Sequence, residues 1–541
     1  MSTLAIDIGT SNSCAYVTIG NASRVVQDND DHLIPSIIRY NQDGSVMCCG
    51  TPALIQYWNA TNIVRCFKRI IGYRMNTREM HDYMNNCLCK VVEGPDGFPA
   101  FDMEAFPGRE LTPTIVTSHL IKYIADLAVS QTDQPINELV ITVPAFFDNV
   151  QREEVKKAIL LSGVCPEGHF KLVSEPVAAA LEYGIVNGVN NKTVMVIDCG
   201  GGTTDICVME INDRVYNVIA THGHNHLGGD DVTNIFREKV EQKYEEYYQE
   251  PLIKAPRNAK LYRVYEEELK SKVEEAKKAF STKQEVTIED LVLGQANIGD
   301  DSDSDDDSDD DSDEDGNHRE LTISRREFDQ VIHEFVTTVV DLTRQTLQKI
   351  NMRKEQIDDV ILVGGSCRLL ALQEALQDEY SNRVKIIDNP DECVARGALR
   401  ASTYEKNRAG IQLFEVIGQN YGFPVFDEFK HKDVFMTLIP RNTRYPSDQV
   451  FSQKLYLVRR SNGSYLDYAD VDLFQSLNGT MEDSMQLASF GIEGATPTGD
   501  PIDVRFTIDE NGFINVEIVQ TCDGRVLLQK CCMIEVQTER Q

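Results

Sequence analysis

The chain has 541 residues, of which 41% are hydrophobic and 26% are charged, as is typical of globular proteins. Its formal net charge of −33 disfavours nucleic acids and anionic membranes as direct partners. No apolar run reaches the roughly 18 residues of a transmembrane helix, and the first residues lack the basic stretch of a signal peptide. The cysteines do not show the paired spacing of a zinc site. We therefore expect reduced thiols in a cytoplasmic protein, with the nucleus as an alternative location.

The first predicted elements are two strands joined by a short polar turn, in residues 5–17 (AIDIGTSNSCAYV), and the first strand ends on Asp7. Glycine lets backbone N–H groups approach phosphate oxygens closely, and hydroxyl groups add hydrogen-bond donors. An aspartate at such a turn can hold a hydrated Mg²⁺ ion. Taken alone, this hairpin has an ordinary turn as its simpler interpretation.

The same pattern recurs in residues 194–208 (VMVIDCGGGTTDICV), where the apolar strand ends on Asp198. P-loop and Rossmann phosphate sites need a strand, a loop and then a helix. Here the loop leads into another strand, so both motifs are excluded. Two such hairpins about 190 residues apart predict two similar lobes that clamp one nucleotide.

Two later segments are candidates for contact with the same ligand. One set of polar residues shares one face of a predicted helix: Glu274, Lys277, Lys278 and Ser281. A solvated charged face has the same spacing, so that interpretation stays open. Gly364 and Gly365 lie between a predicted strand and a predicted helix. Such a turn lets a flat or anionic group lie against the backbone, or it serves only tight packing.

Residues 300–315 contain only Asp, Ser and Glu, and twelve of the sixteen are acidic. Such a run cannot bury apolar surface and repels itself, so we expect a disordered insertion over residues 300–316. Its flanks, residues 285–288 and 320–323, have strand patterns, which places the insertion at a hairpin tip. Each serine of the run has an acid three positions later, a pattern that suits an acidophilic kinase. The tract either steers basic partners electrostatically or is a tolerated insertion.

A domain boundary is predicted at residues 406–416. Before it, strand patterns alternate with helical patterns. Beyond it, nearly every segment alternates apolar and polar residues at period two, with turn signals between the segments. We therefore expect a nucleotide-binding domain over residues 1–405, a linker over 406–416 and an all-β module over 417–541.

With these motifs in place, the sequence resembles the 70-kDa heat-shock chaperone family over almost its full length. The matching segments follow the family's order and spacing; they are residues 7–13, 68–72, 142–147, 175–180, 194–208, 226–231, 363–368 and 389–392. Sugar kinases and actins share the fold and the two hairpins but do not carry these segments together. The resemblance implies an α/β actin-like two-lobed ATPase domain followed by an all-β sandwich that binds peptides, with no C-terminal helical lid.

The resemblance also assigns roles to individual residues. As catalytic residues it implies Lys68, Glu175, Asp198 and Thr203. As Mg²⁺ ligands, largely through water, it implies Asp7, Asp198 and Asp205, with K⁺ as a further candidate ion. As residues that bind ATP or ADP it implies Asp7, Gly9, Thr10, Ser11, Asn12, Gly200, Gly201, Gly202, Thr203, Thr204, Gly228, Gly229, Glu274, Lys277, Lys278, Ser281, Gly364, Gly365, Ser366, Arg368 and Asp391. Phosphoryl transfer to water needs little covalent chemistry from a protein, so such a site acts by electrostatic positioning.

The chain departs from the family at several positions. Lys278 stands where the family usually has an arginine stacked on adenine, which predicts a lower affinity for adenosine. Asn12 replaces a usual aromatic residue or threonine, and Ser174 replaces a usual asparagine. Lys171 and Glu415 keep the charge, but not the geometry, of the arginine and aspartate used for J-domain coupling.

The C-terminal resemblance is weaker, because the segment where the peptide groove belongs does not align cleanly. Val450, Phe451 and Leu455 are candidates for that groove, and ordinary sandwich core is the alternative interpretation. The linker segment 410–416 is less apolar than is usual in the family, but it can still add a strand to the edge of the ATPase sheet.

The leading interpretation is a slow ATP-hydrolysing molecular chaperone, or a chaperone-like regulator of protein folding. The alternative is a nucleotide-binding scaffold or co-chaperone, similar to the lidless ribosome-associated members of the family, in which ATP turnover matters little. The resemblance implies a J-domain co-chaperone, a nucleotide-exchange factor, and unfolded or extended polypeptides as partners. Without a lid, peptides should bind weakly and leave fast. We expect a monomer, and a kinase that acts on the acidic tract as a further partner.

Overall fold

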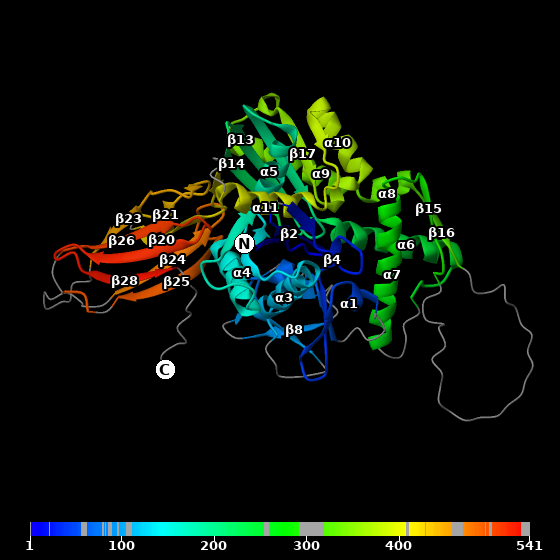
Figure 1. Ribbon diagram of the computed structural model, residues 1–541, viewed down its shortest axis with the longest axis horizontal. Helices are drawn as coiled ribbons and strands as arrows, with labels where there is room; N and C mark the ends of the chain where they lie inside the picture. The colour runs from blue at the N-terminus through cyan, green and yellow to red at the C-terminus, as the bar shows by residue number, and fades with distance from the viewer. Residues whose placement is uncertain are drawn as a thin grey trace, which may run out of the picture.

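The computed structural model describes residues 2–20, 22–55, 62–77, 80–81, 83–84, 89–94, 97–103, 111–253, 259–291, 319–406, 411–427, 429–456, 469–492, 494–496 and 500–531. Two α/β lobes lie one above the other in Figure 1, and an all-β unit lies beside them at the left. Among the described residues, no helix is both long enough and apolar enough to cross a membrane. The acidic tract over residues 300–316 falls outside the described residues.

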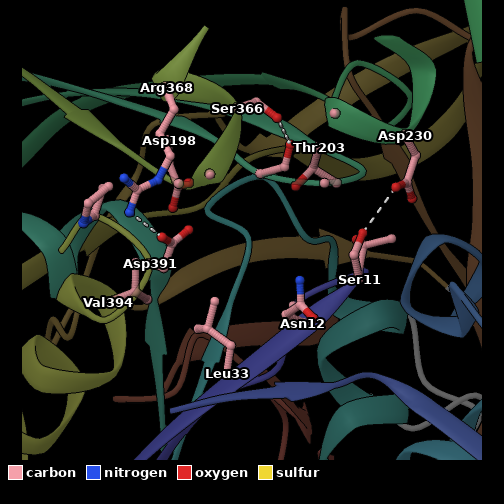
Figure 2. A pocket seen from close by; sticks show the side chains of 18 of the residues that line it. Ser11, Asn12, Leu33, Asp198, Thr203, Asp230, Ser366, Arg368, Asp391 and Val394 are labelled. Carbon is pink, nitrogen blue, oxygen red and sulfur yellow. Dashed lines mark hydrogen bonds and ion pairs between the residues drawn. The ribbon is translucent and has the colours of Figure 1, made fainter. Parts of the chain in front are cut away.

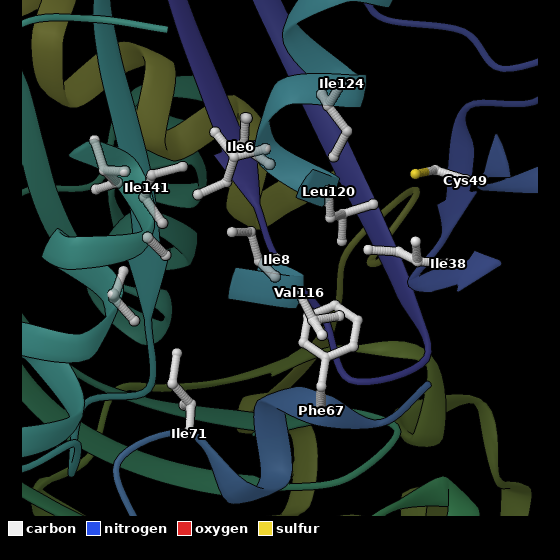
Figure 3. Close-up of a cluster of buried hydrophobic side chains, with 14 of the residues drawn as sticks. Ile6, Ile8, Ile38, Cys49, Phe67, Ile71, Val116, Leu120, Ile124 and Ile141 are labelled. Carbon is white, nitrogen blue, oxygen red and sulfur yellow. The ribbon is translucent and has the colours of Figure 1, made fainter. Parts of the chain in front are cut away.

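The first lobe is built on a mixed sheet with the strand order β11-β10-β1-β2-β3 and with β4 beside β2. Its strands are β1 (Ser2–Asp7), β2 (Asn12–Ile19), β3 (Ala22–Val25), β4 (Leu33–Pro35), β10 (Ile136–Val143) and β11 (Phe170–Ser174). Its longer helices are α3 (Pro113–Thr132) and α4 (Asn149–Ser162). Apolar side chains of β1, among them Ile6, face Leu120 and Ile124 of α3 in the core shown in Figure 3.

Smaller elements cover the outer part of this lobe. They are β5 (Ile37–Tyr40), β6 (Val46–Cys49), α1 (Thr51–Ile55), β7 (Ile63–Arg65), the short 3₁₀ helix η2 (Phe67–Ile70), β8 (Lys90–Glu93) and β9 (Pro99–Asp102). Strands β6, β5 and β7 form a small sheet of their own, and β8 pairs with β9. The turn η2 carries Lys68, whose side chain is buried.

The second lobe repeats the sheet design of the first. Its strand order β18-β17-β12-β13-β14 corresponds to the order β11-β10-β1-β2-β3 of the first lobe. These strands are β12 (Lys192–Cys199), β13 (Thr204–Asn212), β14 (Val215–His224), β17 (Asp359–Val363) and β18 (Val384–Ile386). Its helices are α6 (Gly229–Tyr248), α7 (Ala259–Ala279), α8 (Arg325–Val331), α9 (His333–Lys349) and α10 (Leu370–Tyr380), with the 3₁₀ turns η4 (Lys354–Gln356), η5 (Gly365–Arg368) and η6 (Ser381–Arg383). In both sheets, the first strand of the glycine-rich hairpin also pairs in parallel with a strand from later in the chain.

The flanks of the acidic tract form the predicted hairpin. Strands β15 (Glu285–Ile288) and β16 (Leu321–Ser324) pair antiparallel over four residues each. Val286, Ile288, Leu321 and Ile323 point into the core of the second lobe. The tract is thus inserted between two strands that are fixed by their own apolar contacts.

Two helices lie between the lobes, α5 (Glu175–Asn187) and α11 (Cys393–Lys406). Helix α11 packs on β1 and β10 of the first lobe, α5 packs on β12 and β13 of the second, and the two helices pack against each other. Gly397 makes this close crossing possible, because a Cβ atom there would lie 1.8 Å from the carbonyl oxygen of Ala178. Side chains of both sheets and both helices share one core.

The predicted all-β module is present as two four-stranded sheets, β21-β20-β24-β25 and β23-β26-β27-β28. The strands of these sheets are β20 (Asn420–Asp427), β21 (Lys432–Ile439), β23 (Phe451–Leu455), β24 (Ala469–Ser476), β25 (Ser484–Ile492), β26 (Ile502–Ile508), β27 (Ile514–Gln520) and β28 (Val526–Cys531). The short strand β22 (Arg444–Tyr445) follows β21 in the chain and belongs to neither sheet. Residues from both sheets, such as Phe423 and Phe506, share one apolar core.

The linker adds a strand to the second lobe, as the sequence predicted. Strand β19 (Gln412–Val416) pairs in parallel with β14 and antiparallel with β22 of the β-sandwich, so it joins the two units. The carboxylate of Glu415 accepts hydrogen bonds from the Ser174 N–H at 3.2 Å and from the Tyr445 hydroxyl at 3.1 Å. One buried side chain therefore contacts the first lobe and the sandwich at once.

Candidate functional site: a cleft between two glycine-rich hairpins

A cavity of about 480 Å³ lies between the two lobes. Residues of both hairpins line it, together with residues of η2, α7, η5 and the start of α5. Most of the residues singled out from the sequence border this cavity: Asp7, Gly9, Thr10, Ser11, Asn12, Lys68, Glu175, Asp198, Gly200, Gly201, Thr203, Gly229, Glu274, Lys277, Lys278, Ser281, Gly364, Gly365, Ser366, Arg368 and Asp391. The fold thus gathers segments that are far apart in the sequence.

The turns of the two hairpins face each other across the cleft, and neither has room for a larger residue. A Cβ atom at Gly9 would lie 1.9 Å from the carbonyl oxygen of Asn12, and one at Gly201 would lie 2.3 Å from the hydroxyl of Ser11. The Ser11 hydroxyl also donates to Asp230 of α6 at 3.1 Å, a bond from the first lobe to the second that Figure 2 shows. The glycines therefore let the two backbones close around a small, hydrogen-bond-accepting group.

Lys68 is the cation that the first lobe contributes to the wall of this cleft. Its ammonium lies 2.6 Å from Glu175 Oε1, and both side chains are buried. Burial disfavours the ammonium form, but the Glu175 and Asp7 carboxylates outweigh it and raise the pKa of Lys68. Burial raises the pKa of Glu175 to about 7, although the Lys68 charge opposes that rise. Lys68 therefore stays charged and holds a carboxylate beside it.

Three further carboxylates surround this pair. Burial raises the pKa of Asp7, against the effects of Lys68 and of the Thr142 hydroxyl, which donates to Asp7 at 2.7 Å. Burial also raises the pKa values of Asp198 and Asp205 well above the ordinary range, and the Glu175 carboxylate adds to both rises. So many buried acids beside one lysine leave the site short of positive charge.

The residues fit a hydrated divalent cation. Asp205 accepts a hydrogen bond from the Ala145 N–H through Oδ1, while its buried Oδ2 has no hydrogen-bond partner among the described residues. Within the same residues, no group of three or more acidic, histidine or cysteine side chains converges closely enough to bind a bare metal ion. Oxygen ligands in this open arrangement suit Mg²⁺, which usually keeps several of its waters.

The far end of the cleft carries the predicted helix face of α7. The Lys277 side chain is buried and donates to the Gly229 carbonyl and the Thr233 hydroxyl, both at 2.9 Å. A solvated charged face is thus the wrong interpretation for Lys277. Lys278 has 67% of its side chain exposed and lies 3.5 Å from Glu274. Across from this face, Arg368 pairs with Asp391 at 2.6 Å (Figure 2).

Four of the expected residues do not line the cavity. Thr204 is fully buried, and its hydroxyl donates to the Leu227 carbonyl at 2.6 Å. Gly228 and Gly202 are needed for packing: a Cβ at Gly228 would lie 2.5 Å from the Gly201 carbonyl, and one at Gly202 would lie 2.6 Å from the Thr10 hydroxyl. Asp205 lies behind the surface, as its bond to Ala145 shows. These residues support the loops and do not face the cavity.

Sequence reasoning missed other residues at the cleft. Leu33, Asp230, Leu369, Pro390 and Val394 also line it. The two apolar residues Leu33 and Val394 lie on one side in Figure 2 and offer a surface for a flat ring. Their only signal in the sequence was nearness to recognised motifs, and an apolar residue in such a place is ordinary core in most proteins.

A second missed feature is the ion pair of Arg69 and Asp231. The Arg69 guanidinium donates to both carboxylate oxygens of Asp231, at 3.1 Å and 2.9 Å. Arg69 belongs to the first lobe and Asp231 to the second, so this pair joins the lobes beside the glycine turns. Its two partners are 162 residues apart in the chain, and sequence spacing could not pair them.

The structure does not place the three expected groove residues together at the surface. Phe451 is only 9% exposed and pairs with Phe506 in the sandwich core, as the alternative interpretation holds, and Leu455 is partly buried against the same core. Only Val450 is exposed. The most exposed large apolar side chains among the described residues of the sandwich are Phe426, Phe429 and Tyr456, which are 59%, 99% and 69% exposed.

Comparison with known proteins relates this architecture to one family. The family model described as "Hsp70 protein" matches residues 3–527. "Chaperone protein DnaK" of Thermus thermophilus is 29% identical over 527 residues, which cover 96% of this chain and 79% of that protein. "Chaperone protein DnaK 3" of a Synechococcus species is 28% identical over 531 residues, covering 96% and 75% respectively. "Chaperone protein DnaK" of Buchnera aphidicola is 28% identical over 534 residues, covering 96% and 77%.

Proposed function

Because the chain belongs to the Hsp70 family, we propose that it is a chaperone, or chaperone-like regulator of protein folding, that binds and slowly hydrolyses ATP in the cleft between its lobes. One observation carries the proposal: the buried Lys68–Glu175 pair, 2.6 Å apart, faces the two glycine-rich turns. A cation held beside a carboxylate suits the positioning of a phosphate group and of the water that attacks it.

Each part of the cleft has its own task in this proposal. The backbone N–H groups of the glycine turns, with Thr10, Ser11 and Thr203, hold the phosphates. Lys68 orients the terminal phosphate, and Glu175 orients the attacking water. A bound Mg²⁺, held through water by Asp7, Asp198 and Asp205, neutralises phosphate charge, and K⁺ is a further candidate ion. The face of α7 opposite Arg368 and Asp391 holds the adenosine.

The domain organisation is part of the proposal. Residues 1–405 form the nucleotide-binding domain, residues 406–416 the linker and residues 417–541 the substrate-binding unit. The pairing of β19 with both β14 and β22 supports a linker that passes the nucleotide state on to the sandwich. We also propose a monomer in the cytoplasm, partnered by a J-domain protein and an exchange factor.

Unfolded polypeptide is the proposed substrate of the sandwich, and Phe426, Phe429 and Tyr456 are its proposed contacts. Phe426 and Phe429 lie at the turn between β20 and β21, Tyr456 directly follows β23, and all three are exposed, as peptide contacts must be. Peptide should leave fast, because Phe429 is 99% exposed and no described residue encloses it. Stopped-flow release of a fluorescent apolar heptapeptide measures this, and release over many minutes would contradict it.

A single-turnover assay tests the enzymatic proposal. Radiolabelled ATP is bound to stoichiometric protein with Mg²⁺, and phosphate release is followed with and without an unfolded peptide. We expect slow release that the peptide accelerates. Retention of intact ATP under both conditions would leave only nucleotide binding.

The alternative, a nucleotide-binding scaffold or co-chaperone with little dependence on turnover, is favoured by one observation. The predicted groove residue Phe451 is buried in the core, so the sandwich lacks an apolar groove at that position. In the same assay a scaffold would hydrolyse ATP at a rate that peptide does not change.

A further inference from the structure

Three basic side chains meet where the second lobe touches the β-sandwich, away from the nucleotide cleft. Lys349, at the end of α9, lies 3.2 Å from Nε2 of His222 on β14. Arg441, in the turn after β21, donates to the carbonyl oxygen of Thr221 at 2.8 Å. The cluster therefore takes one residue from a helix, one from a strand edge and one from the other structural unit.

This basic cluster has no acidic counterpart among the described residues, although the protein carries a net charge of −33. Within the described part of the chain, neither Lys349 nor Arg441 forms an ion pair with a carboxylate, and the charges that act most strongly on His222 are those of Lys349, Arg441 and His224. The Nε atom of Arg441 is buried without a hydrogen-bond partner among the same residues. Like charges placed together without compensation disfavour the contact between the two units.

The titration behaviour of the cluster agrees with the geometry. Burial and the charge of Arg441 lower the pKa of Lys349 to about 8. Burial, then Lys349, Arg441 and His224, lower the pKa of His222 to about 4, while a bond to Gln345 opposes the change. Burial alone lowers the pKa of Arg441. Lys349 and His222 thus each have positive charge beside them, and Arg441 is poorly solvated.

We propose that Lys349, His222 and Arg441 form a binding site for a phosphate-class oxyanion, which bridges the second lobe and the β-sandwich. An ammonium group, an imidazole N–H and a guanidinium fork on three sides suit a compact, doubly charged anion with several acceptor oxygens. Lys349 is exposed, so the anion can enter from solvent. Its sources share one chemistry: free inorganic phosphate, or the phosphate of a phosphorylated side chain.

An anion here would act on the contact between the units. Arg441 lies on the sandwich, whereas Lys349 and His222 lie on the lobe, so an anion between them turns a repulsion into an attraction. The contact would then be stronger when phosphate is present. This conclusion does not depend on ATP hydrolysis in the cleft.

Isothermal titration calorimetry tests the site, with an ATP analogue that cannot be hydrolysed and Mg²⁺ filling the cleft in every sample. Inorganic phosphate and O-phosphoserine are titrated separately at constant ionic strength. We expect one phosphate site that Lys349→Ala weakens at least about tenfold. Lys385→Ala is the matched control, because Lys385 is a partly exposed cation of the same lobe, bonded to the Asn382 carbonyl, and it should leave the affinity unchanged. Tighter binding of phosphoserine would name a modified side chain as the source, and tighter binding of phosphate would name the free ion.

A second measurement keeps the test independent of folding defects. NMR of isotope-labelled histidines follows His222, whose signal is identified by its loss in His222→Gln. Phosphate should raise the pKa of His222 from about 4, and Arg441→Lys, which keeps the charge, should retain most of the rise. Equal phosphate affinity of the unmodified protein and Lys349→Ala, no binding of either anion, or an unmoved His222 titration would overturn the proposal.

Discussion

The two lobes share a sheet design but divide the chemistry between them. In each, an apolar strand ends on an aspartate, Asp7 or Asp198, and the glycine-rich turn after it leads into an antiparallel partner. The first lobe adds Lys68, the lysine beside the buried carboxylates. The second adds the helix face of α7 to the cavity wall, and Asp205 lies behind that wall. A ligand with a nucleoside at one end and phosphates at the other must therefore contact both lobes, so its binding favours their closure.

The lobes also differ at the outer edge of the hairpin. In the second lobe the linker strand β19 continues the sheet beyond β14, whereas β3 ends the sheet of the first lobe. Only the second hairpin therefore lies one strand away from a segment that leads into the β-sandwich. A change at Asp205, which pairs with Gly223 of β14, has a short path of hydrogen-bonded backbone to the linker.

The largest predicted effect comes from separating the helices that join the lobes. Gly397→Val places side-chain atoms where the Ala178 carbonyl lies, since even a Cβ there would be 1.8 Å away. We expect the free energy of unfolding to fall by about 3 kcal/mol. Urea denaturation followed by circular dichroism measures it. Gly491→Val is the control, because the nearest atom to a Cβ there is 3.6 Å away; equal shifts in both variants would contradict the close crossing.

The next largest effect is expected on the rate of ATP hydrolysis when Lys68 of the first lobe is replaced. Lys68→Ala should lower the rate of ATP hydrolysis at least about tenfold, or about 1.4 kcal/mol of barrier, and leave ATP binding largely intact. Single-turnover hydrolysis and equilibrium binding of ATP measure the two quantities. Lys122→Ala changes an exposed lysine of the same lobe, paired with Asp126 at 2.5 Å, and should change neither. Undiminished hydrolysis by Lys68→Ala would remove this lysine from the mechanism.

A smaller effect is expected where the second lobe meets the sandwich. Glu415→Ala removes the acceptor of the Ser174 N–H and of the buried Tyr445 hydroxyl. Losing these bonds should weaken the contact between the units by about 1 kcal/mol, roughly a fivefold change in the docked fraction. Small-angle X-ray scattering detects the more extended form. Tyr445→Phe removes one of the two bonds and should have about half the effect; a scattering curve unchanged in Glu415→Ala would show that β19 pairing alone holds the units together.

Local patterns made the glycine hairpins predictable, because the close approach at Gly9 and Gly201 needs a residue without a side chain and leaves a visible signature. The helix face at Glu274 and Lys277 was equally visible from its spacing. Pairings between distant segments were not, because no local rule joins Arg69 to Asp231 or Lys349 to Arg441. The same reason explains Phe451: period-two alternation marks one face of a strand, but only the second sheet decides which face is buried.

The smallest effect is expected from deleting the acidic tract, an insertion that only the second lobe carries. Its neighbours β15 and β16 are held by the core contacts of Val286, Ile288, Leu321 and Ile323. The tract itself has no apolar residue to add to them. Deleting residues 300–315 leaves residues 289–299 and 316–320 to connect the strands, so the melting temperature and the rate of ATP hydrolysis should hardly change. A replacement by glycine and serine of equal length is the control for loop length.

Differential scanning calorimetry and the single-turnover assay measure these two quantities for both variants. The charge of the tract should instead affect the rates at which basic partners associate. At low salt the deletion variant should associate more slowly than the intact protein. At physiological salt, where the screening length is about 8 Å, the difference between the two proteins should be smaller. A fall of several degrees in melting temperature on deletion, with none in the glycine–serine variant, would show that the acidic residues take part in the fold. If neither the deletion nor the salt concentration changes the association rates, the tract is only a tolerated insertion.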